Sequence, residues 1–156
     1  MDKKIKMKFF LAEVDNRKLI ENFEKEHQVT FPGFYKEIVS WHDFITPEKN
    51  IFFYGSKSNE YDSFSFSPWQ EEFGYERVSN IFKDPPEFFP KEIVIFASNG
   101  GGDYLCFDYR NCRENPPIVL WLHEEEENEG IVFLSSSFDE FINNLKSEEE
   151  VGLDRI

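Results

Sequence analysis

The chain has 156 residues, and its 31 acidic residues outnumber 17 basic ones, so the formal net charge is −14. Such a surface repels nucleic acid phosphates and anionic lipids and attracts basic proteins through a long-range field. We therefore expect a basic protein partner and neither nucleic acid nor membrane binding, although an acidic balance also serves simply to keep an aromatic-rich protein in solution.

The apolar segments are short. The longest one near the start, from Phe9 to Ala12, falls below the roughly 7–15 residues of a signal peptide, and no run approaches the roughly 20 that cross a bilayer. We therefore expect a cytoplasmic protein. Cys106 and Cys112, the two cysteines, are too few for a four-cysteine zinc site, and both are expected to be reduced.

Two helices are predicted in the first 45 residues. Asp15 or Asn16 is expected to cap a helix that runs to about His27, and Pro32 suits the first turn of a second helix. Each helix has apolar residues at helical spacing. These residues are Leu19, Ile20 and Phe23 in the first helix and Phe34, Ile38 and Trp41 in the second.

The middle of the chain is less regular. Residues 51–54 are short, apolar and β-prone, and residues 64–66 are expected to follow as a second strand. A short helix is possible near Glu71. The rest of residues 67–90 is expected to be loop, because three prolines interrupt regular structure at its end.

The second half predicts a sheet. Residues 92–97, 103–109, 117–123 and 130–135 are four β-rich runs with Gly-, Pro- or Asn-containing connections, which favours successive antiparallel strands. Ser137 and Glu140 then form a capping-box pattern at the start of an amphipathic helix. Residues 146–156 are polar enough to fray after that helix. No repeat or linker divides the sequence, so a single domain over residues 1–156 is expected.

The order of these segments resembles the SUKH superfamily. The resemblance rests on FPGFYKEIVS, on ASNGGGDYLCFDY, on a Trp-containing strand and on SSFDEFINNL, and it covers most of the chain. The residues that match the family motifs are Pro32, Tyr35, Gly101, Gly102, Asp103, Cys106, Asp108, Trp121, Ser137, Phe138 and Phe141. The resemblance implies an α+β fold, in which a bent, mainly antiparallel sheet of about 5–6 strands packs with two N-terminal helices and a C-terminal helix.

Three kinds of catalytic or ligand site are weighed against structural explanations. Residues 100–102 are three glycines, but a phosphate-binding loop leads into a helix, whereas a strand pattern follows here, so a hairpin turn is favoured. Cys106, Asp108 and His123 have the residue types of a thiol hydrolase, yet Cys106 lies in an apolar strand with nothing to lower its pKa. Asp103, Asp108, His123 and Glu124 lack the spacing of a metal site. No catalytic, cofactor or metal residue is therefore assigned.

The acidic turn after the third strand is the best candidate recognition patch. Five glutamates within six residues repel one another unless they project into water or meet a basic surface, and both outcomes remain open. Aromatic residues in the middle of the chain fit either an interface or the core. The candidate partner-binding residues are Asp103, Asp108, Trp121, Glu124, Glu125, Glu126, Glu127 and Glu129.

The resemblance implies a function in binding. Members of the superfamily include bacterial toxin-neutralising proteins and a fungal cell-wall regulator. We expect a non-catalytic immunity protein, an antitoxin that binds and neutralises a cognate basic toxin, with a nuclease domain as one possible target. The alternative is a regulatory protein-interaction module of the cell-wall assembly regulator type.

Overall fold

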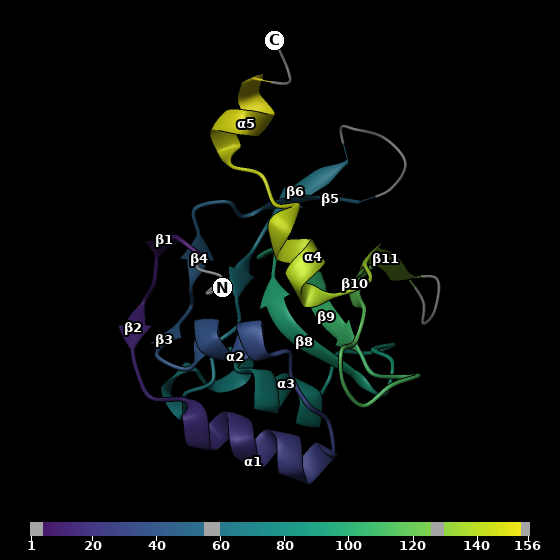
Figure 1. The fold of residues 1–156 in the computed structure, drawn as a ribbon. Coiled ribbons are helices and arrows are strands. Elements are labelled where there is room, and N and C mark those ends of the chain that lie inside the picture. The colour runs from purple at the N-terminus through teal and green to yellow at the C-terminus, as the bar shows by residue number, and fades with distance from the viewer. Residues whose placement is uncertain (1–4, 55–59, 126–129, 154–156) are drawn as a thin grey trace.

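The structure is a computed structural model that describes residues 5–54, 60–125 and 130–153. Its centre is a five-stranded antiparallel sheet in the order β11-β10-β9-β8-β7 (Figure 1). The four longer strands are the four β-rich runs of the sequence, and each pairs with its predecessor, as predicted. The strands are β7 (Ser65–Phe66), β8 (Ile93–Ser98), β9 (Tyr104–Asp108), β10 (Ile118–Trp121) and β11 (Ile131–Ser135).

Three predicted helices are present. They are α1 (Arg17–His27), α2 (Gly33–Val39) and α4 (Phe138–Asn143). The capping box is confirmed in part, because the Ser137 hydroxyl accepts a hydrogen bond of 3.1 Å from the Glu140 backbone N–H. Together with the sheet, these helices confirm the expected α+β fold.

The core is formed by aromatic rings between the sheet and the helices α2 and α4. Phe96 of β8 stacks on Phe107 of β9 with ring centroids 4.5 Å apart, and Phe138 of α4 lies edge-on to both. Tyr35 of α2 adds a further edge-on contact to Phe107. These side chains are at most 1% exposed, so α2 and α4 are held over one face of the sheet (Figure 1).

The N-terminal segment forms a two-stranded ribbon that the sequence pattern did not predict. The strand β1 (Met7–Phe9) pairs with β4 (Thr46–Pro47), and β2 (Ala12–Glu13) pairs with β3 (His42–Asp43). The helix α2 ends at Val39, and the chain then enters β3, which pairs with β2. Trp41 therefore lies beyond the helix and is 47% exposed, which corrects its predicted place in the buried stripe.

The middle of the chain is more regular than predicted. The strand β5 (Ile51–Phe53) pairs with β6 (Tyr61–Ser63), whereas β7 joins the large sheet through β8. A 3₁₀ helix, η1 (Glu71–Glu76), and the helix α3 (Val78–Lys83) lie in the region expected to be mostly loop. The buried side chains of Val78 and Ile81 hold α3 on the core, and two apolar residues were too short a pattern to predict a helix.

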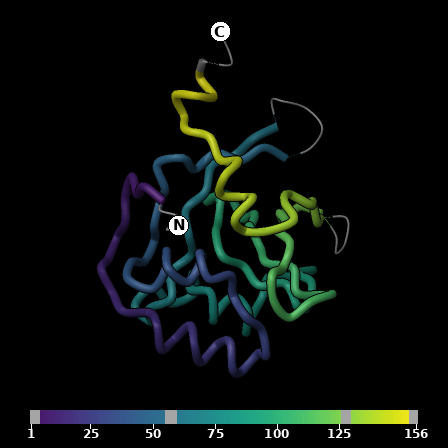
Figure 2. Tube along the Cα trace, viewed as in Figure 1, coloured from purple at the N-terminus to yellow at the C-terminus, as the bar shows by residue number. Residues whose placement is uncertain are grey.

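The C-terminal segment also differs from the expected frayed tail. Lys146 exchanges backbone hydrogen bonds of 3.0 and 2.9 Å with Ile51, and α5 (Glu148–Leu153) follows. The trace leads away from α4 toward this last helix (Figure 2). None of the helices in the described ranges is long and apolar enough to span a membrane. That the whole chain forms one domain stays a prediction.

Candidate functional site

Two turns meet at one end of the large sheet. Residues 99–103 connect β8 to β9, and residues 122–125 follow β10. Because Tyr104 at the start of β9 pairs with Trp121 at the end of β10, both turns lie at the same end. We call this region, residues 99–103 and 122–125, the glycine-turn end.

The first turn is a hairpin held by Asn99. Its side-chain oxygen accepts hydrogen bonds of 2.8 Å from the backbone N–H of Gly101 and 3.2 Å from that of Asp103. Gly100 and Gly102 have φ values of 83° and 103°, which favour glycine. The chain continues into a strand and not into a helix, so the prediction of a hairpin in place of a phosphate-binding loop is confirmed.

Asp103 ties the two turns together. Its Oδ1 accepts a hydrogen bond of 2.9 Å from the His123 backbone N–H and lies 2.7 Å from His123 Nδ1. The hydrogen bond to this carboxylate raises the pKa of His123 above its ordinary value. A side chain at Gly102 would meet the imidazole, because a Cβ there would lie 3.1 Å from Nδ1.

Carboxylates gather around this end without lysine or arginine partners among the described residues. Glu124 is 84% exposed at its side chain, Glu125 is exposed, and Asp62 joins through the Asn99 amide, which donates 2.8 Å to Asp62 and 3.2 Å to Asp103. Among the described residues, the ion pairs of lysine and arginine lie outside the glycine-turn end. His123 is the one basic side chain that pairs with carboxylates at this end. Three further candidates, Glu126, Glu127 and Glu129, lie outside the described residues.

Two predicted partner-binding residues are placed where a partner does not reach them. Trp121 is 1% exposed and lies under Phe89, whose ring centroid is 5.1 Å away. Asp108 is at the opposite end of β9 from Asp103, is 8% exposed, and accepts hydrogen bonds of 2.9 and 2.8 Å from the Arg110 guanidinium. Burial acts to raise the pKa of Asp108, but the hydrogen bonds from Arg110 outweigh it and the pKa is lowered. Both residues are therefore corrected to structural roles.

The remaining motif residues contribute to the core and its capping. The Trp69 indole donates a hydrogen bond of 3.1 Å to the Tyr35 hydroxyl, both within the core. Cys106 is fully buried, and burial raises the pKa of its thiol well above the ordinary value. The motif positions that begin helices or fill the core are Pro32, Tyr35, Ser137, Phe138 and Phe141.

No metal centre is formed within the described ranges. No group of three or more His, Cys, Asp or Glu side chains there is placed to hold a metal ion. Asp103 and His123 do come together, but Asp108 is engaged by Arg110 at the other end of the strand.

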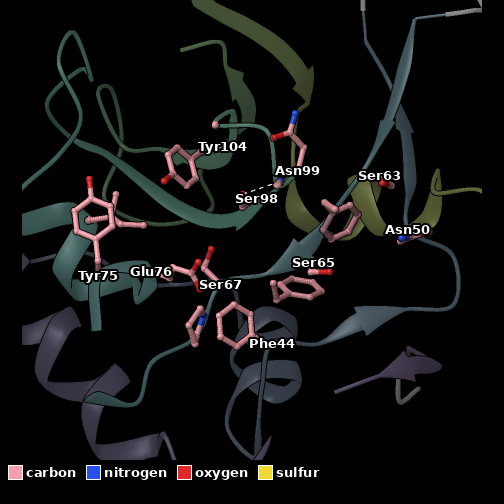
Figure 3. A pocket seen from close by; sticks show the side chains of 16 residues that line it. Phe44, Asn50, Ser63, Ser65, Ser67, Tyr75, Glu76, Ser98, Asn99 and Tyr104 are labelled. Atoms are coloured by element: carbon pink, nitrogen blue, oxygen red, sulfur yellow. Dashed lines mark hydrogen bonds between the residues drawn. The ribbon is translucent and has the colours of Figure 1, made fainter. Parts of the chain in front are cut away.

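A cavity of about 410 Å³ lies beside the glycine-turn end (Figure 3). It is lined by residues of η1, α3, β6, β7, β8 and β9 and of the loops that connect the strands. The lining side chains labelled at one end of the cavity in Figure 3 are Tyr75, Glu76, Ser67 and Tyr104, and those at the other end are Ser63 and Asn50. Hydroxyl groups and aromatic rings dominate the lining. We call this cavity the hydroxyl pocket.

The hydroxyl pocket was not predicted from the sequence. Ser63, Ser65 and Ser67 alternate along residues 63–67, which indicates one polar side of a strand. The other lining residues Tyr75 and Glu76 lie in the segment expected to be mostly loop. The alternation of serine with Phe64 and Phe66 was the available signal. It could not reveal that Tyr75 and Glu76 of η1 line the same pocket, because that arrangement depends on the tertiary structure.

The comparisons with known proteins support the resemblance. The family model described as SMI1 / KNR4 family (SUKH-1) matches residues 16–144. A curated relative, the SPbeta prophage-derived uncharacterized protein YokK of Bacillus subtilis (strain 168), is 36% identical over 61 residues. This match covers 38% of the chain and only 30% of the relative's length. No solved structure gives a significant match.

Proposed function

The chain belongs to the SMI1 / KNR4 family (SUKH-1), and from this premise we propose that it is a cytoplasmic, non-catalytic immunity protein that binds and neutralises a cognate basic toxin domain. The toxin is held by contact at the glycine-turn end and the adjoining hydroxyl pocket. A nuclease domain fits this proposal, because proteins that bind nucleic acid carry basic surfaces.

The observation that carries the proposal is the group of carboxylates at the glycine-turn end that lack lysine or arginine partners within the described part of the chain. Asp62 and Asp103 flank Asn99, and Glu124 and Glu125 project from the next turn. Because His123 is the one basic side chain that meets this group among the described residues, the four carboxylates leave an excess of negative potential that steers a basic partner toward this end. The net charge of −14 adds to the same field.

An exposed aromatic side chain also favours this part of the surface as the binding site. Tyr75, on the rim of the hydroxyl pocket, is 57% exposed. Exposed tyrosines beside a polar rim are typical anchors of protein interfaces. Steering by acids and anchoring by an aromatic ring together fit a tight inhibitor of a basic protein.

The experiment that tests the proposal uses the tagged full chain as bait in native lysate of the source organism, at about 50 mM and about 500 mM salt, because salt screens charge-steered association. We expect a basic domain that is retained at low salt, that arrests growth when expressed alone, and that is tolerated when this protein is co-expressed. A partner whose growth arrest persists on co-expression would contradict immunity.

A pair of matched variants tests the acidic steering. Glu124→Gln with Glu125→Gln is expected to slow association several-fold at low salt and to have little effect at high salt. Glu148→Gln with Glu149→Gln removes the same charge from α5 and serves as the control. Equal effects of the two pairs would mean that total charge, and not the glycine-turn end, governs binding.

The family match also favours a second candidate function, a regulatory protein-interaction module of the cell-wall assembly regulator type. In that function the same face recruits a signalling or biosynthetic protein without inhibiting it. The bait experiment separates the two functions, because the regulatory partner would not arrest growth when expressed alone.

A further inference from the structure

We infer that the hydroxyl pocket is a receptor for a guanidinium group, so that an arginine side chain of the partner inserts beside Glu76 and Tyr75. This inference rests on the proposed function, because it names the group by which a basic partner is held. Three features of the pocket favour a guanidinium group: the charge of the lining, its free hydrogen-bonding groups and its aromatic faces.

The pocket selects a cation by charge. Glu76 is the one charged residue among the described residues that line it, and no lysine, arginine or histidine lines it there. The Glu76 carboxylate has no hydrogen bond or ion pair with another described residue. Asp62, held by the amide of the lining residue Asn99, adds negative potential near that residue. An anionic ligand would be repelled, and a cation would be attracted.

The hydroxyl groups offer further acceptors. Ser65 is already engaged, because its hydroxyl lies 2.6 Å from that of Thr46. The hydroxyls of Ser67, Tyr75 and Tyr104, by contrast, have no hydrogen-bond partner among the described residues. Figure 3 shows these three side chains with Glu76 around one end of the pocket. One carboxylate and three hydroxyls can accept from the five N–H donors of a guanidinium.

Tyr104 lines the same pocket as Tyr75 and Glu76. Burial raises the pKa of Tyr104, and the neighbouring Tyr75 and Glu76 contribute to the same shift. The Tyr104 hydroxyl therefore stays neutral at physiological pH, and it is available as a hydrogen-bond partner without adding charge.

Shape favours arginine over lysine. Tyr75 is 57% exposed at the rim, and the half-buried ring of Phe44 also lines the pocket. A planar, weakly hydrated guanidinium stacks on aromatic faces while its edge donates to a carboxylate, whereas an ammonium is compact and strongly hydrated. The volume of about 410 Å³ lies within the range of small-ligand pockets and admits an arginine side chain.

The test uses small probes and the full chain. ¹⁵N-labelled protein is titrated with N-acetyl-arginine amide to about 20 mM, because a fragment of this size binds weakly. We expect saturable shifts of the backbone amides of Ser67, Tyr75 and Tyr104. The uncharged N-acetyl-citrulline amide, which has the same shape, is expected to leave them unmoved. Equal binding of citrulline, or shifts confined to other parts of the protein, would overturn the inference.

Two matched variants locate the binding. Glu76→Gln is expected to weaken arginine binding about tenfold or more, because it removes a charged hydrogen-bond acceptor. Glu72→Gln changes an exposed glutamate of the same 3₁₀ helix that does not line the pocket, and it is expected to bind as the wild type does. Unchanged thermal midpoints establish that both variants are folded. Equal affinities of Glu76→Gln and wild type would overturn the inference.

The failure of this inference and the failure of the proposed function have different results. Arginine binding in the pocket without any neutralised toxin keeps the inference and removes the immunity function. A neutralised toxin that dissociates from Glu76→Gln at the wild-type rate keeps the immunity function and overturns the role of the pocket.

Discussion

The carboxylate of Asp103 lies 2.7 Å from Nδ1 of His123 and accepts a second hydrogen bond from the His123 backbone N–H. The two residues are 20 positions apart in the sequence, in turns that follow different strands. One side chain therefore fixes the relative position of both turns at the glycine-turn end. The same contact makes the charge of that end depend on pH.

The first prediction concerns this pair. Because Asp103 raises the pKa of His123 in the folded state, the pair stabilises the fold fully below the ordinary pKa of histidine, and that stabilisation is lost as pH rises through the raised pKa. In Asp103→Asn, the pKa of His123 is expected to fall toward about 6.5, as measured by NMR titration of the imidazole. Glu92→Gln, at the other end of the sheet, is the control. An unchanged titration in Asp103→Asn would contradict the assignment.

The second prediction concerns the buried carboxylate of Asp43. It is 1% exposed and accepts hydrogen bonds from the side chain of Asn16 at 2.8 Å and from the backbone N–H groups of Trp69 and Gln70 at 3.0 and 3.1 Å. Asp43→Ala leaves these donors unsatisfied and is expected to cost about 3–5 kcal/mol in the free energy of unfolding, measured in urea.

Asp84→Ala provides the control for this measurement. Asp84 is exposed at the end of α3, and its replacement is expected to change the free energy of unfolding by no more than about 0.5 kcal/mol. A loss of less than about 1 kcal/mol in Asp43→Ala would contradict the account of the buried network.

The third prediction separates a structural motif residue from a surface tyrosine. Tyr35→Phe removes the acceptor of the buried Trp69 indole N–H and is expected to cost about 1–3 kcal/mol of stability. Tyr75→Phe, at the exposed rim of the hydroxyl pocket, is expected to cost no more than about 0.5 kcal/mol. Thermal or chemical unfolding followed by circular dichroism measures both. Equal losses of stability in the two variants would show that the buried hydrogen bond from the Trp69 indole contributes no more than a surface hydroxyl does.

The fourth prediction concerns the thiol of Cys106. Burial raises its pKa and blocks access, so in a Cys112→Ser background it is expected to react with Ellman's reagent only on unfolding. The measured labelling rate should therefore rise with denaturant in parallel with loss of structure. Fast labelling of the native protein at neutral pH would reopen a nucleophilic role for this cysteine.

The sequence by itself determined the elements whose signals are local. The β-rich runs predicted β8 to β11, the capping pattern at Ser137 predicted the start of α4, and residues 99–103 predicted a hairpin turn. These features depend on neighbours in the chain, on side-chain period and on the backbone freedom of glycine. The family motifs then extended these local signals to the α+β fold.

The tertiary structure alone decided which residues meet. The burial of Trp121 and the pairing of Asp108 with Arg110 placed two candidate binding residues in structural roles, although the sequence pattern made them as available as Glu124. The hydroxyl pocket arises because Tyr75 and Glu76 of η1 and Tyr104 of β9, nearly 30 positions apart in the sequence, line one cavity. Burial and contact between distant segments depend on the packing of the whole chain, which no local period encodes.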